Sequence, residues 1–268
     1  MIIVKTPGIN SSGNAKGCRN AGNAIITALD YIHSNEKGIP IDRKLLDLEE
    51  IHVDNDNLEE QGNLIYRNSL ELLEKQEKVI FLGGDHSISF YTGKAFLDHC
   101  KKEKKEACLI VFDAHADCEI PGENPTNRQW LRALIESGFT PSDILLVGNR
   151  NKGQEEISFL SKNKVKQIGM NEISNNLEEI TDIIMEFAHG KELYVSLDIG
   201  VVHPVYSPGI YNKEPGGLTS RQAIYIVSRM SMMKNLKIFD LVEVNIEKDK
   251  DSDGITTKLA AKLLGEVI

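Results

Sequence analysis

Asp113, His115 and Asp117, spaced two residues apart, are the part of this sequence best suited to chemistry. They follow a continuous apolar run over 108–112, which predicts a strand buried on both faces. Side chains alternate along a strand, so we expect all three to point the same way and the intervening alanines the other way. Two carboxylates and an imidazole are costly to bury alone, and a divalent cation would be a suitable partner. A solvated strand-to-loop junction is the simpler interpretation, but the small spacers favour a packed site.

Two further predicted strands end in residues of the same kind. An apolar run leads into the segment 83–87, Gly-Gly-Asp-His-Ser, which contains His86, and a second run ends at Asp198. Open α/β sheets bind ligands at the carboxyl ends of their strands, so His86 and Asp198 can meet the first three residues at one edge. Nitrogen and carboxylate ligands without thiolate suit Mn²⁺, Zn²⁺ or Fe²⁺, and the excess of carboxylates favours Mn²⁺. Two ions sharing carboxylates would deprotonate a bridging water for attack on an sp² carbon.

Strands and helices are predicted to alternate along the chain. This pattern predicts an α/β fold, a three-layer α/β/α arrangement around a doubly wound, mostly parallel sheet. Without a convincing linker or internal repeat, residues 1–268 are expected to form a single domain. Trp130, the single tryptophan, is interpreted as a packing anchor. We expect a loop over 8–17, an acidic connection over 47–60, and helices over 20–33, 60–75, 128–137, 175–189, 219–232 and 256–267.

The composition is that of an ordinary globular protein, with 41% apolar and 26% charged residues among 268. A net charge of −9 argues against nucleic acid and anionic membrane as partners. The 4 cysteines form no CxxC pair, which predicts free thiols in a reducing compartment. We see no signal peptide and no apolar run near the roughly 20 residues of a membrane helix. The expected location is the cytoplasm.

Five motifs together resemble the ureohydrolase family of arginases and agmatinases. They read Gly-Gly-Asp-His-Ser (83–87), Asp-Ala-His-Ala-Asp (113–117), Ser-Leu-Asp (196–198), Glu-Pro-Gly-Gly-Leu-Thr-Ser-Arg (214–221) and Val-Glu-Val-Asn (242–245). They occur in the family's order and at its spacing, and they cover nearly the whole chain. The resemblance implies an arginase-like α/β/α fold, homo-oligomers such as trimers or multiples of them, and a binuclear Mn²⁺ centre that hydrolyses a guanidinium to an amine and urea.

The resemblance also implies residue roles. Asp113 and Asp198 would bridge two ions, with His86 and Asp117 completing the first site and His115 the second. Glu243 would pair with the guanidinium of a small cationic substrate and hold its carbon over the attacking hydroxide. Asp117 would accept hydrogen bonds from the nucleophile and help to pass its proton.

This chain departs from the family's third motif, Asp-x-Asp-x-x-Asp-Pro. Here it reads Asp198-Ile-Gly-Val-Val-His-Pro204, so Gly200 offers no carboxylate to the second ion and His203 is a candidate compensating ligand. We therefore expect one tightly bound Mn²⁺ and a second, weaker one. Asn127 stands where arginases carry a histidine that resembles a proton shuttle, and an amide cannot relay a proton.

We predict a hydrolase acting on linear amidines. The reaction would be the metal-dependent hydrolysis of the C–N bond of a small guanidino compound, releasing urea through attack by a metal-bound hydroxide. The substrate is expected to be more agmatine-like than arginine-like, because the asparagine with which arginases hold the amino-acid head group is not evident after Cys118. The alternative is a catalytically retired homologue that binds one metal ion and acts as a binding or assembly subunit.

Overall fold

Eight strands form one sheet in the computed structural model, which describes residues 1–10 and 15–268. Every pairing between neighbouring strands is parallel, so the sheet is more regular than the mostly parallel one expected. The order across the sheet is β2-β1-β3-β8-β7-β4-β5-β6. The strands are β1 (Ile2–Thr6), β2 (Leu48–Glu50), β3 (Val79–Gly83), β4 (Ala107–Phe112), β5 (Ile144–Val147), β6 (Lys166–Ile168), β7 (Glu192–Asp198) and β8 (Leu236–Val242).

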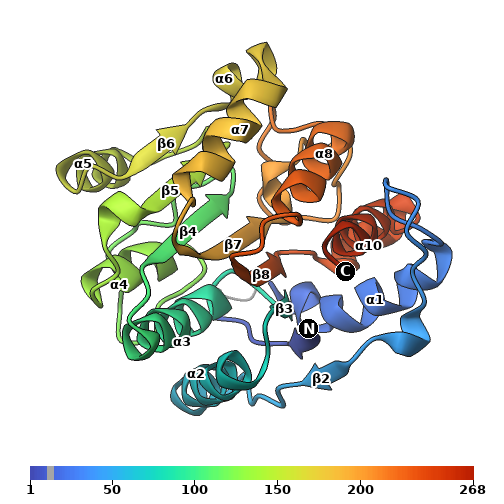
Figure 1. The fold of residues 1–268 in the computed structure, drawn as a ribbon, viewed down its shortest axis with the longest axis horizontal. Helices are drawn as coiled ribbons and strands as arrows, with labels where there is room; N and C mark the ends of the chain where they lie inside the picture. Colours follow the sequence, from blue (N-terminus) through green and yellow to red (C-terminus); the bar gives the residue numbers. More distant parts are fainter. Residues whose placement is uncertain (11–14) are drawn as a thin grey trace.

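Helices cover both faces of the sheet, which gives the three-layer α/β/α arrangement (Figure 1). One face carries α2 (Leu58–Lys75), α3 (Ile88–Glu103), α4 (Trp130–Glu136) and α5 (Gln154–Lys162). The other carries α1 (Ala21–Ala28), α6 (Met170–Asn175), α7 (Leu177–Phe187), α8 (Ser220–Met230) and α10 (Ile255–Val267), with the short α9 (Ile246–Asp249) before α10. The doubly wound fold class predicted from the sequence is confirmed.

The central strands are apolar on both sides because each face of the sheet packs against helices. Along β3, Ile80 and Leu82 enter the core under α1, α8 and α10, whereas Val79 and Phe81 enter the core under α2, α3 and α4. All four side chains are fully buried or nearly so. This packing holds the carboxyl ends of the central strands rigidly in place.

Two elements differ from the expectation. Strand β2 lies inside the predicted acidic connection; it has only three residues, is largely exposed, and pairs with β1 alone, so its sequence carries no apolar pattern. The helix expected over 175–189 begins instead at Leu177, where the Asn176 side chain accepts a hydrogen bond from the Glu179 N–H. The loop expected over 8–17 lies partly outside the described residues. No helix among the residues described has the length and apolarity needed to cross a membrane.

Candidate metal centre

Four adjacent strands, β3, β8, β7 and β4, bring the candidate site residues to one edge of the sheet. β3 and β4 follow one another in the sequence, but β8 and β7 lie between them in the sheet. Where the strand order departs from the sequence order in this way, the loops that follow neighbouring strands lead to opposite faces of the sheet. A crevice opens between these loops at the carboxyl ends of the strands. His86, Asp113, Asp198 and Glu243 each come at or just after the end of one of these strands.

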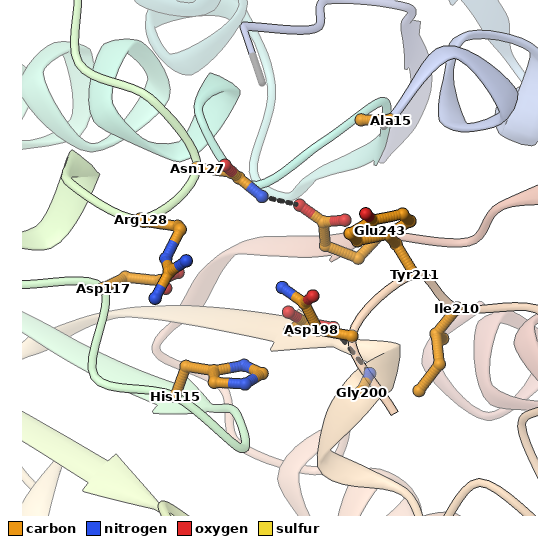
Figure 2. A pocket seen from close by; sticks show the side chains of 11 residues that line it. Ala15, His115, Asp117, Asn127, Arg128, Asp198, Gly200, Ile210, Tyr211 and Glu243 are labelled. Atoms are coloured by element: carbon orange, nitrogen blue, oxygen red, sulfur yellow. Dashed lines mark hydrogen bonds between the residues drawn. The ribbon is translucent and has the colours of Figure 1, made fainter. Parts of the chain in front are cut away.

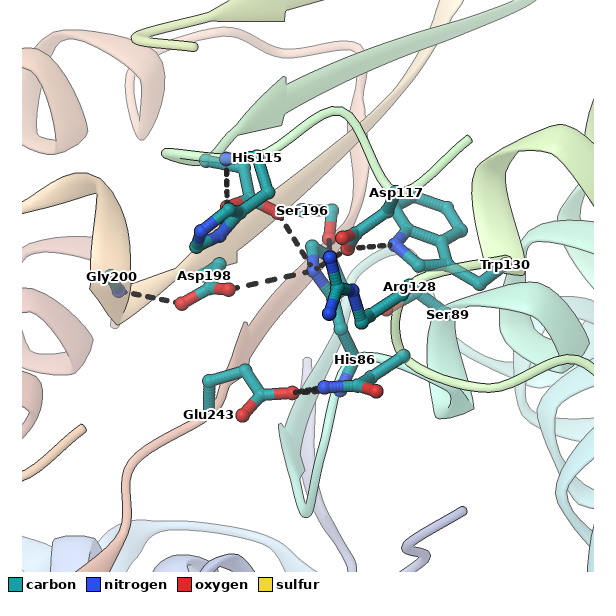
Figure 3. Close-up of polar contacts among 12 residues, drawn as sticks. His86, Ser89, His115, Asp117, Arg128, Trp130, Ser196, Asp198, Gly200 and Glu243 are labelled. Carbon is teal, nitrogen blue, oxygen red and sulfur yellow. Dashed lines mark hydrogen bonds and ion pairs between the residues drawn. The ribbon is translucent and has the colours of Figure 1, made fainter. Parts of the chain in front are cut away.

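A histidine and three carboxylates converge in this crevice (Figure 3). His86 Nδ1 lies 3.1 Å from Asp113 Oδ2, 3.1 Å from Asp117 Oδ2 and 3.8 Å from Asp198 Oδ2. Ligand atoms of His86, Asp113 and Asp198 all lie within 4.8 Å of one another. All four residues are buried. His86, Asp113 and Asp198 are therefore close enough together to surround a single ion, whereas Asp117 contacts His86 but lies outside this compact group of ligand atoms among the described residues.

Hydrogen bonding around His86 leaves its Nδ1 facing the carboxylates. Ser196 Oγ donates to Asp240 Oδ1 at 2.8 Å, so it accepts from His86 Nε2, which lies 2.9 Å away. Once a metal ion displaces the proton from Nδ1, the neutral imidazole keeps its other proton on Nε2 and presents a lone pair at Nδ1. His86 Nδ1 and Asp113 Oδ2 are buried and have no hydrogen-bond partner among the described residues. These orphaned atoms fit a divalent metal ion, and the nitrogen–carboxylate donor set suits Mn²⁺ among others.

Electrostatics also favour a cation here. Burial raises the pKa of Asp198 well above its usual value, and the nearby Asp113 and Glu243 carboxylates raise it further. Burial together with Asp113 raises the pKa of Asp117 to about 6. Burial alone would lower the pKa of His86, but its ion pairs with Asp113 and Asp117 raise it well above its usual value. The group therefore retains protons that a metal ion would displace.

His115 lies beside this group with a different environment. Its Nδ1 is 3.6 Å from Asp113 Oδ1, and its Nε2 is 3.5 Å from Glu214 Oε1 in the loop before α8. Its side chain is 21% exposed, and it is outside the compact group of ligand atoms among the described residues. A metal-binding histidine commonly has its second nitrogen oriented by a carboxylate, and Glu214 is placed to do this.

The expected alternation through Asp117 is wrong in detail. β4 ends at Phe112, so Asp113 to Asp117 are not a strand, and Asp117 has φ +50°. Asp113 and Asp117 both contact His86 Nδ1 although the chain between them is not a strand, and the His115 side chain remains 21% exposed.

The third motif keeps Asp198 but has no second carboxylate facing it. The Gly200 N–H donates to Asp198 Oδ1 at 2.5 Å, at the start of a short 3-10 helix (Ile199–Val201). His203 Nδ1 accepts from the Val205 N–H at 3.2 Å, and its ring lies against Tyr206. His203 is not in the compact group of ligand atoms among the described residues, so its compensating role stays a prediction.

Trp130 does more than pack. It is fully buried, its Nε1–H donates to Asp117 Oδ2 at 2.9 Å, and its ring centroid lies 4.6 Å from that of His86. The sequence alone indicates only that a buried tryptophan needs a hydrogen-bond acceptor for its indole N–H. Which carboxylate serves that need depends on how the loop before α4 folds.

Replacing Trp130 with phenylalanine is expected to weaken Mn²⁺ binding by about tenfold, the lower end of what losing an orienting partner of a ligand costs. The Asp117 carboxylate would lose the indole N–H that holds it, whereas the aromatic contact with His86 would be largely kept. Calorimetric titration with Mn²⁺ is the measurement. Phe139→Leu, in the same hydrophobic core, is the packing control. Equal losses of affinity in both variants would mean that the hydrogen bond is irrelevant.

Glu243 follows β8 and turns back toward the site with φ +66°. Its Oε1 accepts from the His86 backbone N–H at 3.0 Å and from Asn127 Nδ2 at 3.0 Å, and its Oε2 lies 4.0 Å from the Cys18 thiol. Burial, followed by the charge of Asp85, raises the pKa of Glu243 to about 7. Asn127, noted in the sequence only as a missing histidine, is therefore a direct partner of this carboxylate.

A pocket of about 130 Å³ opens over these residues (Figure 2). Its acidic floor contains Asp117, Asp198 and Glu243, and Arg128 stands beside it. The full lining is Ala15, His115, Asp117, Asn127, Arg128, Asp198, Gly200, Ile210, Tyr211, Asn212 and Glu243. Such a floor suits a cationic group, and the volume suits the end of a small molecule.

Comparisons with known proteins point the same way. A sequence model of the Arginase family matches residues 1–268. An arginase of Staphylococcus aureus (strain MSSA476) is 25% identical over 258 residues, which cover 90% of this chain and 79% of that protein. Formimidoylglutamase from Bacillus subtilis has a similar fold, with a TM-score of 0.85 and 24% identity over 99% of this chain and 85% of that one. The agmatine ureohydrolase of Thermoplasma volcanium gives a TM-score of 0.84 and 24% identity, covering 99% and 87%.

Proposed function

This chain belongs to the arginase family, and from that premise we propose that it is a metal-dependent hydrolase that cleaves a C–N bond of a small guanidino compound and releases urea. One observation carries the proposal: Glu243, Asp117 and Asp198 line a single small pocket directly beside the His86–Asp113 pair. A guanidinium held by Glu243 would then sit next to the ion-binding group. We further propose that residues 1–268 act as one domain, in a cytoplasmic homo-oligomer such as a trimer.

The residues divide the work as follows. His86, Asp113, Asp117 and Asp198 would hold one Mn²⁺, and Asp113, His115 and Asp198 a second. Bound divalent ions supply Lewis acidity, which lowers the pKa of a water molecule and readies it to attack. Glu243 binds the guanidinium through charge-assisted hydrogen bonds and orients its carbon.

The remaining groups orient Glu243 and transfer a proton from the attacking water. Asn127 and the His86 N–H hold Glu243 Oε1 in place. The Asp117 carboxylate, oriented by Trp130, accepts a hydrogen bond from the attacking water and passes its proton toward the leaving amine. The water oxygen adds to the guanidinium carbon, and the C–N bond to the amine then breaks. The second water proton is released as the C=O bond of urea forms, so the amine leaves as an ammonium that carries both protons.

After dialysis against metal-free buffer, the protein is expected to retain about one Mn²⁺ per chain. Gly200 offers no carboxylate, so the ion at His115 should be weaker than the ion at His86 and should bind only at higher Mn²⁺ concentration. Elemental analysis of the dialysed protein, followed by calorimetric titration with Mn²⁺, measures both. Two tightly held ions after dialysis would contradict this expectation and would leave His203 or a water molecule as the replacement ligand.

Urea release tests the proposed activity. Protein loaded with Mn²⁺ should produce urea from at least one of a panel of guanidino amines, guanidino acids and arginine, and a chelator should abolish the release. A chain that binds one ion yet turns over none of them would instead be a retired binding or assembly subunit. The feature that favours this second candidate is Gly200 combined with Asn127, which removes one ligand and one proton relay.

A further inference from the structure

We propose that Arg128 binds a carboxylate at the far end of the substrate, so that the pocket takes an ω-guanidino carboxylic acid in preference to a guanidino amine. This inference rests on the proposed function and refines its substrate class. It also revises the expectation that the substrate resembles agmatine, which ends in an amine.

Arg128 is the one permanent cation among the described residues that line the pocket. The other ionisable residues of that lining are His115, Asp117, Asp198, Tyr211 and Glu243. Figure 2 shows Arg128 beside Asp117, with Glu243 across the pocket. The lining thus has two kinds of charge: buried carboxylates on the floor, which suit a guanidinium, and an arginine at the rim, which suits an anion.

The side chain of Arg128 lies at the mouth and not on the floor. It is 60% exposed, whereas Asp117 and Asp198 are only 10% exposed. A guanidino compound that places its cationic end beside Glu243 must direct the rest of its chain outward, because the pocket holds only about 130 Å³. The outer end of the ligand therefore arrives where the guanidinium of Arg128 is available.

The backbone of Arg128 is fixed but its side chain can exchange partners. Its carbonyl accepts from the Glu119 N–H at 3.0 Å, and its N–H donates to Thr126 Oγ1 at 3.4 Å. Its Nη2 pairs with Glu119 Oε1 at 2.9 Å, where the side chain of Glu119 is 41% exposed. An ion pair this exposed is weak, and a guanidinium has five N–H donors. A substrate carboxylate can therefore form a bidentate contact with the guanidinium of Arg128, either together with Glu119 or in its place.

The same geometry disfavours a guanidino amine. Its terminal ammonium would approach Arg128, and like charges repel at close range. No such penalty applies to an acid, for which both ends of the ligand meet opposite charge. The pocket therefore discriminates between guanidino compounds by the sign of the charge at the end of the ligand opposite its guanidinium.

The test compares two compounds of similar length, 4-guanidinobutanoate and agmatine, with the Mn²⁺-loaded full chain. The wild type should have a higher kcat/KM for the acid. Arg128→Met should lower the acid-to-amine ratio of kcat/KM by about 10- to 100-fold, mainly through KM for the acid, because one charge-assisted contact is lost. Glu119→Gln should move the ratio the other way, by freeing Arg128. Arg221→Met removes an equal charge from an exposed ion pair with Glu36 and should leave the ratio unchanged.

Calorimetric binding of both compounds to the same proteins separates this inference from the proposed activity. Arg128-dependent binding of the acid supports the inference even in a chain that releases no urea, an outcome that would overturn the proposed activity alone. A wild type that prefers agmatine in binding and turnover, or an Arg128→Met variant with an unchanged ratio, overturns the inference even when urea is released.

Discussion

Replacing Glu243 with glutamine is expected to reduce kcat/KM for any guanidino substrate by about 100-fold or more, the cost of breaking a buried charge pair. The amide oxygen can still accept from the His86 N–H and from Asn127, so the fold and the metal site should survive. What disappears is the negative charge that the guanidinium needs. Urea release under substrate-limited conditions, together with Mn²⁺ content, measures the effect.

The matched control for this change is Glu247→Gln. Glu247 is exposed on α9 and does not belong to the pocket lining. Its replacement by glutamine removes the same charge as Glu243→Gln. It should leave activity, ligand binding and metal content as they are. If Glu243→Gln retains the thermal stabilisation that a guanidino ligand gives the wild type, the carboxylate is not the guanidinium site. That result would support the interpretation of the chain as a catalytically retired binding or assembly subunit.

Introducing an aspartate at Gly200 is expected to tighten the second Mn²⁺ by about 100-fold, because each added anionic ligand shifts metal affinity by orders of magnitude. Residue 200 lines the pocket, and its N–H already contacts Asp198 Oδ1. A carboxylate there would face the ion beside His115. Elemental analysis and calorimetry report occupancy, and urea release reports whether the second ion limits turnover.

Gly200→Ala isolates the carboxylate from the added bulk. A Cβ at this position would come within 2.9 Å of Asp198 Oδ1, so both variants require that carboxylate to turn slightly. Only the aspartate should gain metal. A gain in metal with increased urea release supports an enzyme held back by a half-filled site, and a gain in metal with background turnover supports the retired subunit. Failure of Gly200→Asp to gain metal contradicts both.

The strand ends were predictable because two simple signals coincide there. Apolar runs such as that ending at Phe112 identify buried strands, and the polar residues that follow must lie at the edge where parallel strands end. This reasoning anticipated that His86, Asp113 and Asp198 come together. It could not anticipate how Asp113 to Asp117 turn, because this segment follows the end of β4 and its contacts are with α4, where the N–H of Leu131 and the indole of Trp130 donate to Asp117.

The supporting contacts were not predictable for a related reason. Trp130 meets Asp117, Asn127 meets Glu243, and Glu214 meets His115 across loops that are far apart in the sequence or irregular in structure. No periodicity connects such pairs, and only the folded chain brings them together. Strand β2 was missed because a short, exposed edge strand needs no apolar alternation.

The left-handed backbone at Asp117 and Glu243 means that this site is held at the expense of stability. Residues other than glycine adopt positive φ at a cost on the order of 1 kcal/mol each. Glycine would relieve that cost at either position, yet it would remove a carboxylate from the pocket. Selection for stability alone would therefore favour glycine at 117 and 243, and retaining two acidic residues there is a trade-off between a more stable fold and a site that can bind a cation.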